Sequence, residues 1–300
     1  MTPGSTTGSV DGTFVIGQFR WVLGRPNIGK RRSRWSLATY VSIWTLTVLL
    51  VRGALAAVTV EPIEIAAEED AAPWSKADGT GFANELVRAA FAAVAIDVRL
   101  RVLPYARCKH LVSEGNVAAC FSMSRSPDPA PSVVFAAVPL FVCSSELFQR
   151  VDDPRKIYRE GDIPARSVVG TVVGYEYPEA IYRLKKAGRI RLEEVDSEEL
   201  NLTKLAAGRI RFAVMNLNDT KPAEWLMAKT KTLGKVEKAF QGGALESYIG
   251  FSVKHPRGLW ALAKFNEGFR IITANGTAEA IHRRWVKLMA DELRRLEGSK

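Results

Sequence analysis

The sequence predicts an α/β fold built from two similar halves. Strand patterns, in which apolar residues alternate or form short runs, are repeatedly followed by patterns with an apolar residue every third or fourth position. This alternation runs from residue 58 to residue 123 and restarts at residue 167. Strand–helix–strand order of this kind implies parallel sheets with right-handed crossovers. The chain has 300 residues, 47% of them hydrophobic, which is enough for two lobes with apolar cores.

The first half is expected to hold three strands and two helices. Apolar residues recur every fourth position from Phe82 to Val94, which predicts an amphipathic helix. A shorter helix is expected to open at Pro104 and to end at Gly115, because these residue types favour those positions. The expected elements in chain order are strand 58–65, helix 81–95, strand 98–102, helix 104–115 and strand 117–123.

The second half repeats the pattern, and a segment at 139–148 is expected to join the two halves. Pro178 marks the first turn of one helix, and Ser197 is a suitable cap for the next, which Gly208 ends. The expected elements are strand 167–173, helix 178–188, strand 190–195, helix 198–207, strand 210–215 and helix 221–231. A strand over 245–253 and two helices over 257–272 and 277–297 follow.

The N-terminal segment has the pattern of a secretory signal. A basic stretch from Lys30 to Arg34 precedes an uncharged apolar run, 37–51, and a small-residue site at Ala54–Ala56. The run is shorter than the roughly 20 residues that span a bilayer, so we expect cleavage after Ala56 and export to the periplasm. An uncleaved anchor is the alternative, and both the general and the twin-arginine routes stay open.

The net charge of +10 does not indicate nucleic-acid binding. Residues 1–56 hold seven of the 42 Lys and Arg residues and one of the 32 acidic residues. The remaining chain therefore carries a charge of only +4 and shows no strong basic stripe.

Three cysteines, Cys108, Cys120 and Cys143, allow one disulfide and one free thiol in an oxidising compartment. A bond between Cys120 and Cys143 is the favoured pairing, because both lie in apolar, strand-like runs. Buried free thiols are the alternative. The cysteine spacing fits no metal site, and we expect neither a metal nor another cofactor.

Ligands of open α/β sheets bind beyond the carboxyl ends of the strands, which selects a small set of loops. These loops are rich in aromatic rings, hydroxyls, amides and arginine, the mixture that a concave ligand site needs. Each of these side chains also has a structural interpretation, as packing, helix capping or surface. The expected ligand-binding residues are Trp74, Tyr105, Arg107, Ser122, Ser124, Arg125, Tyr175, Tyr177 and Asn216.

Several short motifs occur together in a characteristic order. They are Pro73-Trp74, Thr80-Gly81-Phe82, Leu103-Pro104-Tyr105-Ala106-Arg107-Cys108, Gly115-Asn116-Val117 and Ser124-Arg125-Ser126-Pro127-Asp128. Over roughly residues 58–290 the chain thereby resembles the family-3 extracellular solute-binding proteins, the polar amino-acid-type receptors of ABC importers.

The resemblance implies a two-lobed type II "Venus flytrap" fold with two crossover strands as its hinge. The implied parts are a leader, 1–56, one lobe formed by 57–143 plus 249–300, and a second lobe, 144–248. It further implies a monomer that captures a small polar molecule between its lobes and delivers it to the permease of an ABC importer in the inner membrane.

Two positions depart from the family pattern. Pro129 stands where amino-acid receptors of this family place the arginine that holds the ligand carboxylate, and Asn216 stands where a carboxylate pairs with the ligand ammonium. An arginine–carboxylate pair is a strong contact, so its loss argues against a standard α-amino acid ligand. Arg107 or Arg125 could replace it.

Two other functions fit the same fold. A transport-independent sensor agrees with the missing ligand-binding residues. A dehydratase-like enzyme requires an acid or base in the cleft, and Glu176 and Asp219 are the candidates. The expectation from the sequence is a binding protein that is not an enzyme.

Overall fold

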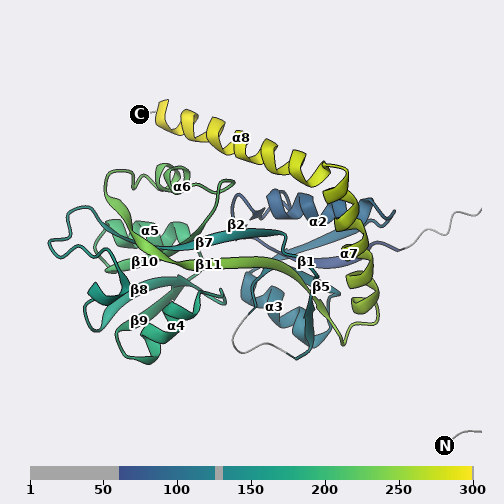
Figure 1. Ribbon diagram of the computed structural model, residues 1–300, viewed down its shortest axis with the longest axis horizontal. Coiled ribbons are helices and arrows are strands. Elements are labelled where there is room, and N and C mark those ends of the chain that lie inside the picture. Colours follow the sequence, from purple (N-terminus) through teal and green to yellow (C-terminus); the bar gives the residue numbers. More distant parts are fainter. Residues whose placement is uncertain (1–60, 126–130, 299–300) are drawn as a thin grey trace, which may run out of the picture. The chain divides into compact units, whose positions relative to one another are not determined.

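Two groups of parallel strands, joined by two long antiparallel strands, form the main sheet of the computed structural model (Figure 1). The structure describes residues 61–125 and 131–298, which lie in one compact unit, Thr59–Lys300. The predicted leader, 1–56, and Pro129 lie outside the described residues. The strand order is β4-β1-β5-β11-β7-β10-β8-β9, and β6 also pairs with β11.

The first lobe is built on parallel strands in which β1 lies between β4 and β5. Ile63 of β1 pairs with Val98 of β4, and the register continues to Glu68 and Leu103 at the other end. Four of the six residues of the inner strand β1 are apolar, and five are buried because helices cover the sheet. The bounds are β1 (Ile63–Glu68), β4 (Val98–Leu103), β5 (Ala119–Met123), α2 (Phe82–Ala92) and α3 (Tyr105–Glu114).

The second lobe repeats this plan with β8 between β10 and β9. All six residues of β10, Phe212–Leu217, are buried, as expected for a strand with other elements on both faces. The bounds are β8 (Ser167–Val172), α4 (Glu179–Lys186), β9 (Ile190–Val195), α5 (Glu198–Ala206), β10 (Phe212–Leu217), α6 (Ala223–Lys229) and a short 3-10 turn (Glu160–Asp162).

The two lobes are connected by β7 (Phe141–Arg150) and β11 (Val236–Ser252), which run antiparallel to each other through both (Figure 1). β11 pairs with β5 and β6 (Val133–Phe135) near its carboxyl end and with β7 along the rest. These are the two crossover strands that the fold prediction requires. The predicted limits between the lobes, at 143/144 and 248/249, fall within β7 and β11. These limits stay predictions.

The remaining elements complete the first lobe. A small hairpin, β2 (Asp70–Ala71) and β3 (Ser75–Lys76), follows β1. The helices α7 (Gly258–Ala274) and α8 (Thr277–Gly298) pack beside α2, and α8 continues across to α6 of the second lobe (Figure 1). None of the described helices is both long and apolar enough to cross a membrane.

The cysteine pairing differs from the favoured prediction. Cys108 of α3 is bonded to Cys120 of β5, and Cys143 is a buried free thiol. Cys143 lies on β7, which is separated from β5 by β11 in the sheet. Neighbouring strands are about 4.8 Å apart, so strands two places apart are too distant for a disulfide. α3 instead packs directly on β5 and presents Cys108 to it.

Candidate ligand-binding site

A cavity lies between the two lobes, at the carboxyl ends of the parallel strands. It is lined by side chains that follow or end β1, β4, β5, β8 and β10, as the rule for open α/β sheets predicts. Its volume in this arrangement is about 30 Å³, which holds little more than one water molecule. The lining residues are Glu68, Trp74, Tyr105, Ser122, Ser124, Phe141, Cys143, Tyr175, Glu176, Asn216, Leu245 and Ser247.

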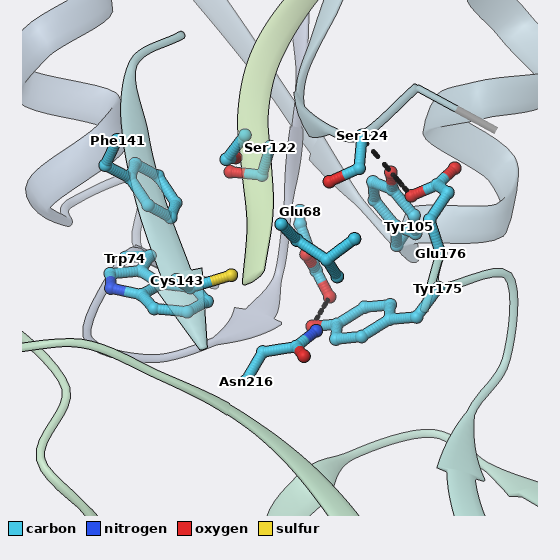
Figure 2. A pocket seen from close by; sticks show the side chains of 12 residues that line it. Glu68, Trp74, Tyr105, Ser122, Ser124, Phe141, Cys143, Tyr175, Glu176 and Asn216 are labelled. Carbon is cyan, nitrogen blue, oxygen red and sulfur yellow. Dashed lines mark hydrogen bonds between the residues drawn. The ribbon is translucent and has the colours of Figure 1, made fainter. Parts of the chain in front are cut away.

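The loop after β1 places Trp74 at one wall of the cavity. The backbone N–H groups of Phe82 and Ala83 donate to the carbonyl oxygens of Pro73 and Trp74, so the start of α2 holds the loop. Gly81 allows this approach because a Cβ atom there would lie 2.3 Å from the Trp74 carbonyl oxygen. The indole ring then packs against Phe141, with ring centroids 4.7 Å apart (Figure 2).

Several hydrogen bonds connect the first lobe directly to the second. Tyr105 donates to Glu176 at 2.7 Å, and Lys109 donates to the other oxygen of Glu176 at 2.5 Å. Tyr175 donates to Glu68 at 2.6 Å, and the Trp74 indole donates to Thr220 at 3.0 Å. Such bonds contribute about 1 kcal/mol each, so the lobes are held closed by the protein's own side chains.

The two carboxyl groups of the cavity have different surroundings. Glu176 is buried and accepts bonds from Tyr105, Lys109 and the backbone N–H of Ser124. Glu68 is 4% exposed, and its side chain accepts a hydrogen bond from Tyr175. Among the described residues, no Lys, Arg or His side chain forms an ion pair with Glu68.

Burial therefore raises the pKa of Glu68 from 4.5 to about 8. The hydrogen bond from Tyr175 and the positive charge of Lys221 lower this pKa in part, and the nearby charges of Glu198 and Asp70 raise it. Burial, together with Glu68, also raises the pKa of Tyr175 well above its ordinary value. The tyrosine thus remains a donor, and burial favours the protonated form of Glu68.

A buried ion pair supports the second-lobe side of the cavity. Lys221 is 2% exposed and bonded to Glu198, and its ammonium lies 4.4 Å from the centre of the Trp74 ring. Glu198 also accepts the backbone N–H of Asn216 at 2.6 Å, and the Asn216 side chain accepts a bond from Ser145. This network fixes Trp74 and Asn216, and it occupies the buried ammonium of Lys221.

Six of the nine residues predicted to bind ligand line the cavity: Trp74, Tyr105, Ser122, Ser124, Tyr175 and Asn216. The structure places the other three outside this cavity, and their role in ligand binding stays a prediction. Arg107 is exposed on α3, and Arg125 is exposed with its guanidinium 4.8 Å from the centre of the Tyr248 ring. Tyr177 is buried in the core of the second lobe and hydrogen-bonded to the backbone N–H of Val172.

The predicted list omits six of the lining residues, and Glu68 is the most important. It is the last residue of β1, so the strand-end rule could have selected it, but it begins the acidic run Glu68-Glu69-Asp70. The hydroxyls of two lining residues, Ser122 and Ser247, are buried without a hydrogen-bond partner in the part of the chain that the structure describes. Buried polar groups are normally bonded, so these hydroxyls are available to a ligand.

The structure of the chain is similar to those of several two-lobed binding proteins. A histidine kinase sensor domain with similarity to periplasmic binding proteins superposes with a TM-score of 0.64 and 20% sequence identity, covering 75% of this chain and 96% of that domain. The GluR0 ligand-binding core from Nostoc punctiforme, in complex with L-glutamate, gives a TM-score of 0.61 and 20% identity, covering 75% and 99% of the two chains.

This chain has the periplasmic-binding-protein fold. An ancestral arginine-binding protein bound to arginine also superposes, with a TM-score of 0.63, 16% identity and coverage of 75% of this chain and 97% of that one. No protein-family model and no curated protein sequence matches the chain. The two-lobed fold predicted from the resemblance to family-3 solute-binding proteins is confirmed.

Proposed function

We propose that this protein is a periplasmic solute-binding protein that closes on a small polar molecule and delivers it to an ABC importer. The cavity between two lobes supports this function most directly. It combines aromatic walls, free hydroxyls and a buried carboxyl group at the carboxyl ends of two groups of parallel strands. The resemblance to importer receptors and the fold of the structural neighbours agree with it.

Ligand entry requires the lobes to separate about β7 and β11. The closed cavity is too small for an organic molecule, and hydrogen bonds between the two lobes hold it closed. A ligand that contacts both lobes then favours the closed arrangement by its differential contacts. Export through a leader cleaved after Ala56 and action as a monomer complete the proposal.

Binding without chemical change is also part of the proposal. Glu176, one of the two candidate acids for an enzyme, has both oxygens occupied by hydrogen bonds. Asp219, the other, is exposed and lies 2.9 Å from the His282 ring, outside the cavity. A sensor that does not transport its ligand is the second candidate function, because one similar structure is a sensor domain of a histidine kinase.

Thermal unfolding in the presence of a broad metabolite library tests the binding function. At least one small polar compound is expected to raise Tm, because a ligand that binds the folded state stabilises it. Trp74→Ala is expected to abolish the rise, whereas Trp260→Ala, at a partly exposed position on α7, is expected to leave it unchanged. Trp74→Phe keeps an aromatic ring in this wall of the cavity, so it tests ligand binding with less loss of packing than Trp74→Ala.

No rise with any compound would refute the binding function. Equal rises in the Trp74 and Trp260 variants would show that the ligand binds elsewhere. Deleting the gene then separates the two physiological roles. Loss of ligand uptake supports transport, and unchanged uptake with a lost transcriptional response supports sensing.

A further inference from the structure

We infer that the cleft selects small organic cations that carry no carboxylate group. This inference rests on the proposed binding function and assigns its ligand class. The twelve residues that line the cavity include two glutamates and, in the described part of the chain, no Lys, Arg or His. The lining therefore offers carboxyl groups that can bind a ligand cation, and it offers no cationic side chain that could bind a ligand carboxylate.

Glu68 is the group that a ligand cation would contact. The charge of Glu176 is already balanced by Lys109, whereas Glu68 is buried without an ion-pair partner among the described residues. An isolated buried carboxylate is strongly disfavoured, and a positive charge beside it restores the ionised form. A ligand ammonium or guanidinium can supply that charge at the point where Tyr175 now donates its hydrogen bond.

Among the described residues, the cations that could bind a ligand carboxylate, Lys109 included, are paired elsewhere or directed away from the cavity. Arg107 and Arg125 are exposed and do not line the cavity. The buried ammonium of Lys221 is paired with Glu198 and covered by the Trp74 ring. Residues 126–130, which the structure does not describe, are Ser, Pro, Asp, Pro and Ala and add no positive charge.

The remaining walls also suit a cation. The rings of Tyr105 and Tyr175 meet edge to face with centroids 5.2 Å apart, and both line the cavity beside Glu68 (Figure 2). The electron-rich faces of such rings attract organic cations. The unbonded hydroxyl oxygens of Ser122 and Ser247 can accept hydrogen bonds from N–H groups.

Two matched pairs of compounds test this ligand class by titration calorimetry. Agmatine and arginine share a guanidinium, and cadaverine and lysine share an ammonium, but only arginine and lysine carry a carboxylate. At least one amine is expected to bind, and at least tenfold more tightly than its amino acid. Choline and tetramethylammonium extend the panel to quaternary cations, and succinate and glucose represent anions and neutral molecules.

Glu68→Gln provides the decisive variant because it keeps the shape of the side chain and removes its charge. It is expected to weaken binding of the cation at least tenfold. Glu160→Gln removes a carboxylate from a surface ion pair with Arg183 and is expected to leave the affinity unchanged. Circular dichroism and Tm of both variants verify that each is folded.

The possible failures are distinguishable. An amino acid that binds as tightly as its amine, or a Glu68→Gln variant with full affinity for the cation, would overturn the ligand class. Binding of succinate, glucose or another uncharged or anionic library compound alone would overturn the class but leave the binding function intact. Absence of binding by any panel or library compound would overturn both.

Discussion

Glu68→Gln should make the stability of the protein less sensitive to pH. In the folded protein, burial raises the pKa of Glu68 to about 8, compared with 4.5 for the hydrated side chain. Each tenfold difference in acidity corresponds to about 1.4 kcal/mol, so the full difference is about 5 kcal/mol. This value is an upper limit, because opening the cleft hydrates the carboxylate without unfolding the lobes.

The raised pKa fixes the sign of the effect. The folded protein holds the proton more tightly than the unfolded chain, so this contribution to stability is complete below pH 4.5. It decreases as the pH rises and is lost above about pH 8. The difference in unfolding free energy, wild type minus Glu68→Gln, should therefore fall by up to about 5 kcal/mol between pH 4 and pH 9.

Denaturant unfolding at a series of pH values measures this difference, with Glu160→Gln as the control for removal of a carboxylate. The unfolding free energy of the Glu160→Gln control should show the same pH dependence as that of the wild type. A difference between wild type and Glu68→Gln that is constant from pH 4 to pH 9, or that grows with pH, would refute the assignment of Glu68 as a protonated buried group.

Three further predictions concern the same site and its support. A bound cation favours the ionised form of Glu68. The affinity for the cation should therefore rise up to tenfold per pH unit below about pH 8 and then level off. Calorimetry over pH 6–9 measures this profile, and an affinity that does not change with pH would contradict the prediction. Cys108→Ser should destabilise the protein by about 3 kcal/mol, because the bond to Cys120 closes a short loop, and unchanged denaturant unfolding under non-reducing conditions would disprove its formation. Lys221→Met should lower the unfolding free energy by about 3–5 kcal/mol, since it leaves Glu198 buried without its partner. Replacing both residues by Met should lower the unfolding free energy less. A double variant as unstable as the single one would argue against this pairing.

The parallel strands and most helices were predictable because their apolar patterns are regular. The two strands that connect the lobes were harder to predict. β7 includes Ser144, Ser145 and Glu146, and β11 includes Gly242 and Gly243. Polar residues and glycines normally interrupt strand patterns, but here they are tolerated where the two strands pair with each other. The sequence therefore indicated a linker at 139–148 where β7 forms, and the strand expected over 245–253 is only the carboxyl-terminal part of β11.

The candidate site was predictable to the level of loops but not of side-chain directions. The strand-end rule selected the loops that contain Trp74, Tyr105 and Tyr175, all of which line the cavity. The direction of a side chain depends on its neighbours in three dimensions, and Arg125 turns outward to the Tyr248 ring. Glu68 was missed because an acidic residue in an acidic run is usually hydrated, and its burial depends on contacts with the other lobe.

The free thiol of Cys143 provides a direct reporter of whether the cleft opens and closes on a ligand. It lines the cavity and is the free cysteine of the chain, since Cys108 and Cys120 are bonded. Burial raises its pKa to about 12, so the closed form should react slowly, because the thiolate is the reactive species.

The decisive measurement is the rate of Cys143 alkylation by N-ethylmaleimide, followed by intact mass, with and without the library compound that raises Tm most. Labelling of the ligand-free protein should be measurable, and saturating compound should slow it at least tenfold. Identical labelling rates with and without a bound compound would contradict closure of the two lobes around a ligand.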